Sequence, residues 1–151
     1  MPEQFAYRTH YTWEKMSDHT LVLDCSDPRL SQARHEFLTE YCKVPLHDSL
    51  IVPGGPVTAT HASALCFVEH ERIKMLHSLH QFVRVIAIAH HNCGYYANKY
   101  PGTNAEQLRE YQIYDLHTFR QNAKILVPGA EIELYYVGPN DQNLVEYTRI
   151  T

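Results

Sequence analysis

Cysteine and histidine side chains follow two apolar runs of the chain, at the points where the runs end. Cys25 comes directly after the run 20–24, and His90 and Cys93 come directly after the run 82–89. Two thiolates and an imidazole are soft or borderline ligands of the kind that suits Zn²⁺. The separation of His90 and Cys93 lets one turn present both side chains to the same ion. The pattern predicts a zinc site whose fourth position is left to water or a carboxylate.

An aspartate and an arginine stand close to the first of these cysteines. Asp27 could occupy the fourth position itself, but Arg29 can hold its carboxylate through two hydrogen bonds and keep it off the metal. Asp27 would then accept a hydrogen bond from zinc-bound hydroxide and orient that hydroxide toward an electrophile. Zinc lowers the pKa of a bound water from ~15.7 toward ~7. Because two thiolates weaken this effect, we expect activity under slightly alkaline conditions.

The remaining cysteines and histidines are interpreted more simply. Cys42 and Cys66 fall on predicted helices and are expected to pack in the core. For His91 two interpretations stay open: a solvated neighbour of the ligand His90, or a proton shuttle. Four histidines follow helical spacing in part and are interpreted as one face of an amphipathic helix: His61, His70, His77 and His80.

Strands and helices alternate along the chain and must position these residues. Strand patterns cover 20–24, 49–53, 82–89, 130–137 and 143–150, and helix patterns cover 30–42, 58–80 and 104–122. The unbroken apolar run 82–89 predicts a central parallel strand that is covered on both faces. The order predicts an α/β fold with a mostly parallel central sheet, helices on both faces and an antiparallel C-terminal edge hairpin.

Local signals mark the helix starts and the domain organisation. Ser31 is the expected N-cap of the first helix, and Asn104 with Gln107 resembles a capping box. The length of 151 residues fits one domain, 1–151. Residues 1–18 are polar and aromatic without a clear period, and we interpret them as an N-terminal arm that lies over the body or over a partner subunit.

Composition excludes several classes of protein. Thirteen Lys and Arg against 17 Asp and Glu give a formal net charge of −4, with 44% hydrophobic and 20% charged residues. These values are typical of a globular protein. Without a basic run, nucleic acid is not the expected partner, and no stretch approaches the ~20 apolar residues that span a membrane. With four cysteines and no secretory pattern, the cytoplasm is the expected compartment.

Two short motifs, in this order and each after a strand, resemble those of the β-class carbonic anhydrase family. Cys25-Ser-Asp27-Pro-Arg29 is similar to the family's Cys-x-Asp-x-Arg, and His90-His-Asn-Cys93-Gly94 to its His-x-x-Cys-Gly. The match in strand context spans 20–96, and the closing hairpin is also similar to the family's end.

This resemblance implies an activity and a set of site residues. The activity is the zinc-dependent, reversible hydration of carbon dioxide to bicarbonate, in a homodimer or higher homo-oligomer with edge strands and the N-terminal arm packed across it. Cys25, His90 and Cys93 would be the zinc ligands, and Asp27 with Arg29 the catalytic dyad. Asp27 would bind zinc itself in a closed form, and the backbone around Gly94 would line the substrate pocket.

The sequence also departs from the family, which leaves other functions open. Val52-Pro53-Gly54-Gly55 stands where members usually carry Arg-Asn-Ala-Gly, and Tyr95 and Tyr96 replace small residues. The two tyrosines could belong to the core or to the pocket. With the altered segment, the same chemistry could hydrolyse carbonyl sulfide or carbon disulfide. The third possibility is a non-catalytic zinc-binding protein in which Asp27 closes the site permanently, although such a site would have less need of Arg29.

Overall fold

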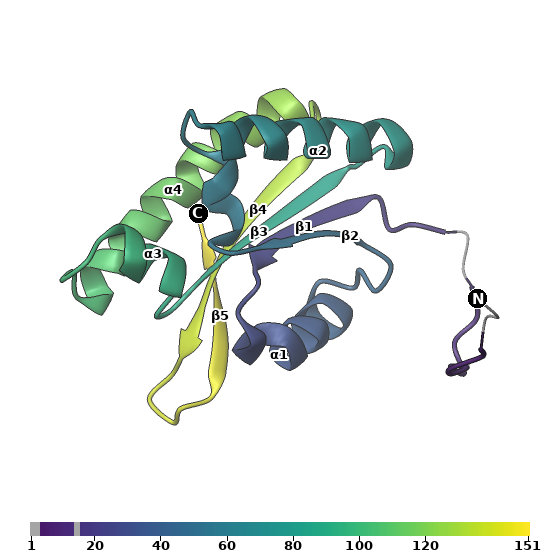
Figure 1. Ribbon diagram of the computed structural model, residues 1–151, viewed down its shortest axis with the longest axis horizontal. Coiled ribbons are helices and arrows are strands. Elements are labelled where there is room, and N and C mark those ends of the chain that lie inside the picture. Colours follow the sequence, from purple (N-terminus) through teal and green to yellow (C-terminus); the bar gives the residue numbers. More distant parts are fainter. Residues whose placement is uncertain (1–3, 14–15) are drawn as a thin grey trace.

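A sheet of five strands is the centre of the computed structural model, which describes residues 4–13 and 16–151 (Figure 1). The strands are β1 (Thr20–Cys25), β2 (Asp48–Val52), β3 (Arg84–His90), β4 (Glu131–Pro139) and β5 (Val145–Ile150). They lie in the order β2-β1-β3-β4-β5; the first four are parallel and β5 is antiparallel to β4. The predicted mostly parallel sheet with an antiparallel C-terminal hairpin is confirmed.

The central strand β3 serves two hydrophobic cores at once. Because successive side chains of a strand point to opposite faces, Val85 and Ala87 join one core and Ile86 and Ile88 the other. All four side chains are completely buried. The unbroken apolar run that marked this strand in the sequence therefore reflects burial on both faces.

Helices cover both faces of the sheet. In Figure 1, α2 (Ala64–His80) and α4 (Ala105–Leu126) lie above the sheet, whereas α1 (Ser31–Glu36) lies below it. A π-helical turn, Phe37–Tyr41, continues α1, and the ring of Phe37 stacks on that of Tyr147 from β5 at 3.9 Å between ring centres. The prediction of helices on both faces is confirmed.

The start of the first helix differs from the prediction. Pro28–Leu30 form a 3-10 turn that Asp27 caps, since its side chain accepts a hydrogen bond from the Arg29 backbone N–H. Ser31 is then already helical, and its hydroxyl donates to the Pro28 carbonyl. The predicted N-cap at Ser31 is wrong, because Pro28, with its fixed φ, begins the turn three residues earlier.

Two further helices also differ. The predicted helix 58–80 is divided: Gly55–Ala59 form a 3-10 turn, and α2 begins only after Ser63, whose side chain caps it. A short helix, α3 (Gly94–Lys99), was not predicted. The capping box of Asn104 and Gln107 is confirmed at the start of α4, which continues to Leu126, beyond the predicted end at 122.

The described part of the predicted arm does not bury its aromatic side chains on the body. Residues 4–13 are exposed throughout, and the Trp13 side chain is 95% exposed. Residues 1–3 and 14–15 of the arm lie outside the described residues, and a position over a partner subunit stays a prediction. No helix in the described ranges has both the length and the apolar character that crossing a membrane requires.

Candidate metal centre

Two neighbouring parallel strands bring three side chains of types that can bind a metal ion to one edge of the sheet. β1 pairs with β3 in parallel; Cys25 ends β1, His90 ends β3, and Cys93 follows after a short turn. The sulfur atoms of Cys25 and Cys93 lie 3.9 Å apart. The ligand atoms of all three side chains lie within 4.8 Å of one another, so within the described part of the chain these buried residues could hold a metal ion.

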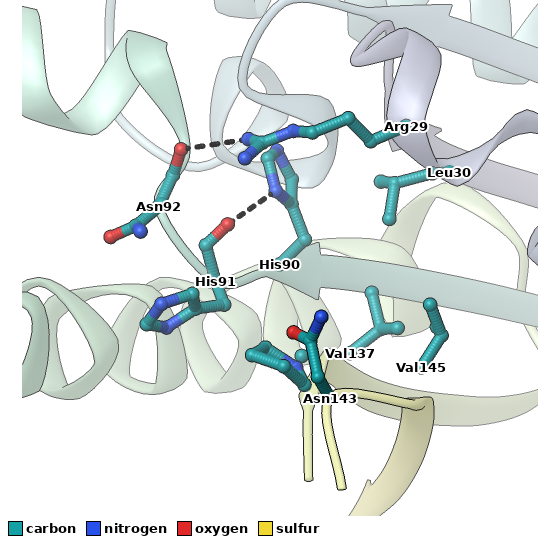
Figure 2. A pocket seen from close by; sticks show the side chains of 10 residues that line it. Arg29, Leu30, His90, His91, Asn92, Val137, Asn143 and Val145 are labelled. Carbon is teal, nitrogen blue, oxygen red and sulfur yellow. Dashed lines mark hydrogen bonds between the residues drawn. The ribbon is translucent and has the colours of Figure 1, made fainter.

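The orientation of His90 fits a metal ligand. Its Nδ1 lies 2.9 Å from the carbonyl oxygen of His91 (Figure 2), and because a carbonyl only accepts, Nδ1 carries the proton. Nε2 is therefore left with a lone pair, and this buried atom has no hydrogen-bond partner among residues 4–13 and 16–151. Buried polar atoms are almost always paired, and a histidine that ligates a metal usually donates its other N–H in this way. The donor set thus fits a metal ion.

The two sulfur atoms are close enough for one thiol to donate a hydrogen bond to the other. A hydrogen bond from Cys93, against the effect of burial, lowers the pKa of Cys25 to about 4, and the Gly54 backbone N–H acts in the same direction. The neighbouring Cys25 thiolate and burial raise the pKa of Cys93 well above its usual range. The site therefore stabilises negative charge on sulfur, which is the form that binds metals.

Asp27 and Arg29 form a bidentate ion pair beside these residues. The Arg29 Nε lies 3.0 Å from Asp27 Oδ1 and its Nη2 lies 2.6 Å from Oδ2, and this pairing holds the pKa of Asp27 at about 2. The same Nη2 donates to the Asn92 carbonyl at 3.2 Å (Figure 2). Asp27, with both oxygens bonded to Arg29, is not in the group of three that could hold a metal ion.

The segment that departs from the family lies directly over the metal-binding residues. Gly54 and Gly55 both have positive φ, +83° and +57°, and the Gly54 N–H lies 3.4 Å from Cys25 Sγ. A Cβ on Gly54 would be 2.8 Å from the ring of Tyr95, and one on Gly55 would be 2.9 Å from the backbone at Cys25. Both positions therefore require glycine. The sequence did not predict the contact of Gly54 with Cys25; the pair of adjacent glycines was the signal available for it.

The residues that follow Cys93 divide between core and surface. Tyr96 is buried in the core, and its hydroxyl donates to Asp115 at 2.6 Å. Tyr95 is half-buried against Gly54. Gly94, predicted to line a substrate pocket, is the exposed first residue of α3, and a Cβ there would meet no atom within 4 Å.

Further polar groups that the sequence did not single out hold the metal-binding residues in place. Asp24 is fully buried and accepts from the Cys25 backbone N–H at 2.6 Å and from Arg34 at 3.1 Å. Burial raises the pKa of Asp24 to about 6, although Arg34 opposes this effect. On the other strand, Gln112 donates its side-chain N–H to the His90 carbonyl at 2.9 Å. Asp24 directly precedes Cys25, but no pattern in the sequence pairs it with Arg34, and Gln112 is 22 residues from His90.

A cavity of about 320 Å³ lies beside His90. Figure 2 shows Leu30, Val137 and Val145 contributing apolar side chains to it, with Asn92, Asn143 and the half-buried His91 as polar groups. The cavity thus lies between the segment that carries Arg29, the turn after β3 and the β4–β5 hairpin.

The remaining cysteines and histidines have specific surroundings. Cys42 and Cys66 are both buried, and burial raises the pKa of Cys42 to about 11. The interpretation of four histidines as one helix face is wrong for His61, which precedes α2 and contacts Asp115. The other three do lie on α2, where each ring has its own partner: Ala59 for His70, Phe82 for His77 and Asp48 for His80.

Comparisons with known proteins identify the fold of this chain. No family model and no curated protein matches its sequence. The β-carbonic anhydrase isoform I of Trichomonas vaginalis has a solved structure that superposes with a TM-score of 0.51 at 16% identity, over 92% of this chain and 87% of that chain. A β-carbonic anhydrase of the fungus Aspergillus fumigatus reaches 0.48 at 13% identity, over 86% and 74%. The first similarity, together with the observed strand order, shows that this chain has a β-carbonic anhydrase-like fold.

Proposed function

We propose that the chain catalyses the zinc-dependent, reversible hydration of carbon dioxide to bicarbonate, with Cys25, His90 and Cys93 as the zinc ligands. The observation that carries the proposal is the buried Nε2 of His90, which has no hydrogen-bond partner among the described residues and lies beside the two sulfur atoms of Cys25 and Cys93. Two sulfurs and one imidazole leave one position of a tetrahedral zinc open, as catalytic zinc sites do. The name and fold of the solved protein from Trichomonas vaginalis support the same activity.

Zinc bound by these residues would lower the pKa of a coordinated water toward neutrality and so supply the nucleophile. Asp27 remains a carboxylate at neutral pH, because Arg29 holds its pKa at about 2. It can therefore accept a hydrogen bond from the proton of the attacking oxygen without removing that proton. Arg29 in turn keeps the Asp27 carboxylate away from the open position, since it bonds to both of the oxygens.

The substrate would approach from the cavity beside His90. The apolar Leu30, Val137 and Val145 that line it fit a small, neutral molecule. His91 lines this cavity and is placed where it could pass a proton to solvent. We also propose a homodimer or higher homo-oligomer with the exposed N-terminal arm at its interface; sedimentation velocity would measure it.

Stopped-flow carbon dioxide hydration, combined with zinc analysis, tests the proposal. We expect about one zinc ion per chain and a rate that rises from neutral to alkaline pH. Asp27→Asn should keep zinc and lose about 100-fold in rate, because it removes the carboxylate that orients the nucleophile. Asp141→Asn, in the exposed turn of the hairpin, is the control and should match the wild type.

Two results would redirect the assignment. Fully zinc-loaded protein with no hydration between neutral and alkaline pH would overturn the proposal. If the same samples then hydrolysed carbonyl sulfide or carbon disulfide, the substrate would be one of these electrophiles. If they turned over none of the three, the chain would be a non-catalytic zinc-binding protein.

A further inference from the structure

Three side chains from three segments form a hydrogen-bonded chain behind Cys93. The hydroxyl of Tyr96, from α3, donates to Asp115 Oδ2 at 2.6 Å. His61, from the loop before α2, donates its Nε2 proton to Asp115 Oδ1 at 2.7 Å. Tyr96 and Asp115 are buried, whereas the His61 side chain is 46% exposed. Each carboxylate oxygen thus has a donor, which a buried carboxylate requires.

This chain of contacts reaches Cys93 through the backbone of α3. Cys93 is the N-cap residue of α3, and its carbonyl accepts a hydrogen bond from the Ala97 backbone N–H at 3.0 Å. The orientation of a metal ligand depends on the contacts that fix the residue carrying it. The position of α3 therefore matters for any metal that Cys93 binds.

The helix α3 depends on contacts with the rest of the fold. It has only six residues, and a helix of this length has little stability of its own. The Tyr96 ring is buried in the core and the Tyr95 ring packs against it. Among the described residues, the bond from Tyr96 to Asp115 is the one side-chain hydrogen bond of this helix.

Asp115 belongs to an element that also holds the other metal-binding strand. α4 has 22 residues and packs on the sheet through Leu116 and Phe119. Its Gln112, three residues before Asp115 and so on the same helix face, donates to the His90 carbonyl. One face of α4 therefore contacts the His90 backbone and, through Tyr96, the segment that follows Cys93.

We propose that His61, Asp115 and Tyr96 are positioning residues for Cys93, which hold α3, and with it the N-cap residue Cys93, in place and thereby set the strength with which the site binds zinc. The inference rests on the proposed zinc site and adds to it a determinant of metal affinity. The Tyr96 hydroxyl is suited to the role as a constant donor, because burial and the charge of Asp115 hold its pKa far above the usual range.

Tyr96→Phe removes the hydroxyl and keeps the ring, and the chain offers a matched control. Tyr135 is equally buried, and its hydroxyl donates to Glu133 at the same distance, 2.6 Å. Tyr135→Phe therefore loses the same kind of hydrogen bond away from the metal-binding residues. Zinc affinity is measured by chelator competition, and sulfur–metal bonding by the thiolate-to-metal absorption of Co²⁺-loaded protein.

We expect Tyr96→Phe to bind Zn²⁺ about tenfold more weakly and to shift the Co²⁺ absorption, while Tyr135→Phe matches the wild type in both. A folded Tyr96→Phe protein with wild-type affinity and spectrum would overturn the inference. If Tyr96→Phe does not fold, the zinc affinity of His61→Ala, at the exposed end of the chain of contacts, is measured in its place. A loss of about twofold to threefold supports the inference, and no change overturns it.

The experiment separates this inference from the proposed function. Wild-type protein that binds zinc and does not hydrate carbon dioxide would overturn the function, whereas the affinity comparison would still decide the role of Tyr96. Conversely, an active wild type and an unaltered Tyr96→Phe site would leave the function in place and remove the positioning role.

Discussion

The backbone N–H of Gly54 lies 3.4 Å from the sulfur of Cys25. The segment after β2 therefore contributes a donor to the site even though it lacks the arginine and asparagine expected from the family. The donor is a backbone group, so its place depends on the conformation at Gly54 and not on a side chain. This relationship makes the turn a direct target for mutation.

Gly54→Ala should weaken both folding and metal binding. Its φ of +83° is unfavourable for alanine, and the new Cβ would lie 2.8 Å from the Tyr95 ring, so we expect a loss of about 1–3 kcal/mol in unfolding free energy and weaker zinc binding. Gly102→Ala is the control, because Gly102 has nearly the same φ, +80°, and open space around it. Urea denaturation measures the first effect, and chelator competition the second. Equal results for the two variants would contradict the close contact at Gly54.

Arg29→Lys should reduce turnover with little effect on stability. Lysine keeps the charge but cannot form the bidentate pair with Asp27, so the carboxylate becomes free to take the open position of the metal. The Arg29 side chain is 63% exposed, and exposed pairs contribute at most about 1 kcal/mol. We expect hydration to fall about tenfold or more with zinc retained. An unchanged rate in the stopped-flow assay would show that Arg29 does not restrain Asp27.

Glu133 should make folding sensitive to acid. Burial raises the pKa of Glu133, but hydrogen bonds from Arg84 and Tyr135 outweigh it, so the folded-state pKa lies below its ordinary value of 4.5. The pair then stabilises the fold fully above that value, and the contribution is lost as pH falls through the lowered pKa. Glu133→Gln should cost about 3 kcal/mol at neutral pH, because it leaves Arg84 without its charged partner. Denaturation at pH 7 and at pH 3 should show this difference shrinking; a constant difference would argue against the ionic contribution.

The cysteines should divide by reactivity once metal is removed. The pKa of Cys25, about 4, makes it a thiolate at neutral pH, whereas burial raises that of Cys42 to about 11. Thiolates are the reactive form, so iodoacetamide should label Cys25 well before Cys42 in chelator-treated protein, and added zinc should protect Cys25. Peptide mass spectrometry measures the order. Labelling of Cys42 first, or no protection by zinc, would contradict it.

Patterns that are local in the sequence predicted their elements well. The apolar run around Ile86 indicated a strand covered on both faces, and Asn104 with Gln107 indicated a helix start. Both signals act through the backbone of their own element, so they do not depend on the rest of the fold. The meeting of Cys25 with His90 followed from one further assumption, that their strands are neighbours, and β1 and β3 do pair.

Features that depend on distant contacts could not be predicted in this way. The helix α3 shows no apolar period in the sequence, because Tyr96 is its one buried residue. A hydrogen bond to Asp115 of α4 holds that residue. Gln112 reaches the His90 carbonyl only once α4 is packed on the sheet. For Ser31, the preference of serine for the N-cap predicted the helix start. Pro28, with its fixed φ, begins the turn three residues earlier.

The parallel pairing of β1 with β3 also determines when, during folding, Cys25 and Cys93 come together. Cys25 and Cys93 are 68 residues apart, and a parallel pair needs its long crossover connection to be closed before the two strands meet. A compact zinc motif with closely spaced ligands can capture its ion while the chain is still unfolded. Here the three candidate ligands meet only after most of the sheet has assembled, so an ion bound by them would enter a nearly finished protein and would not nucleate its folding.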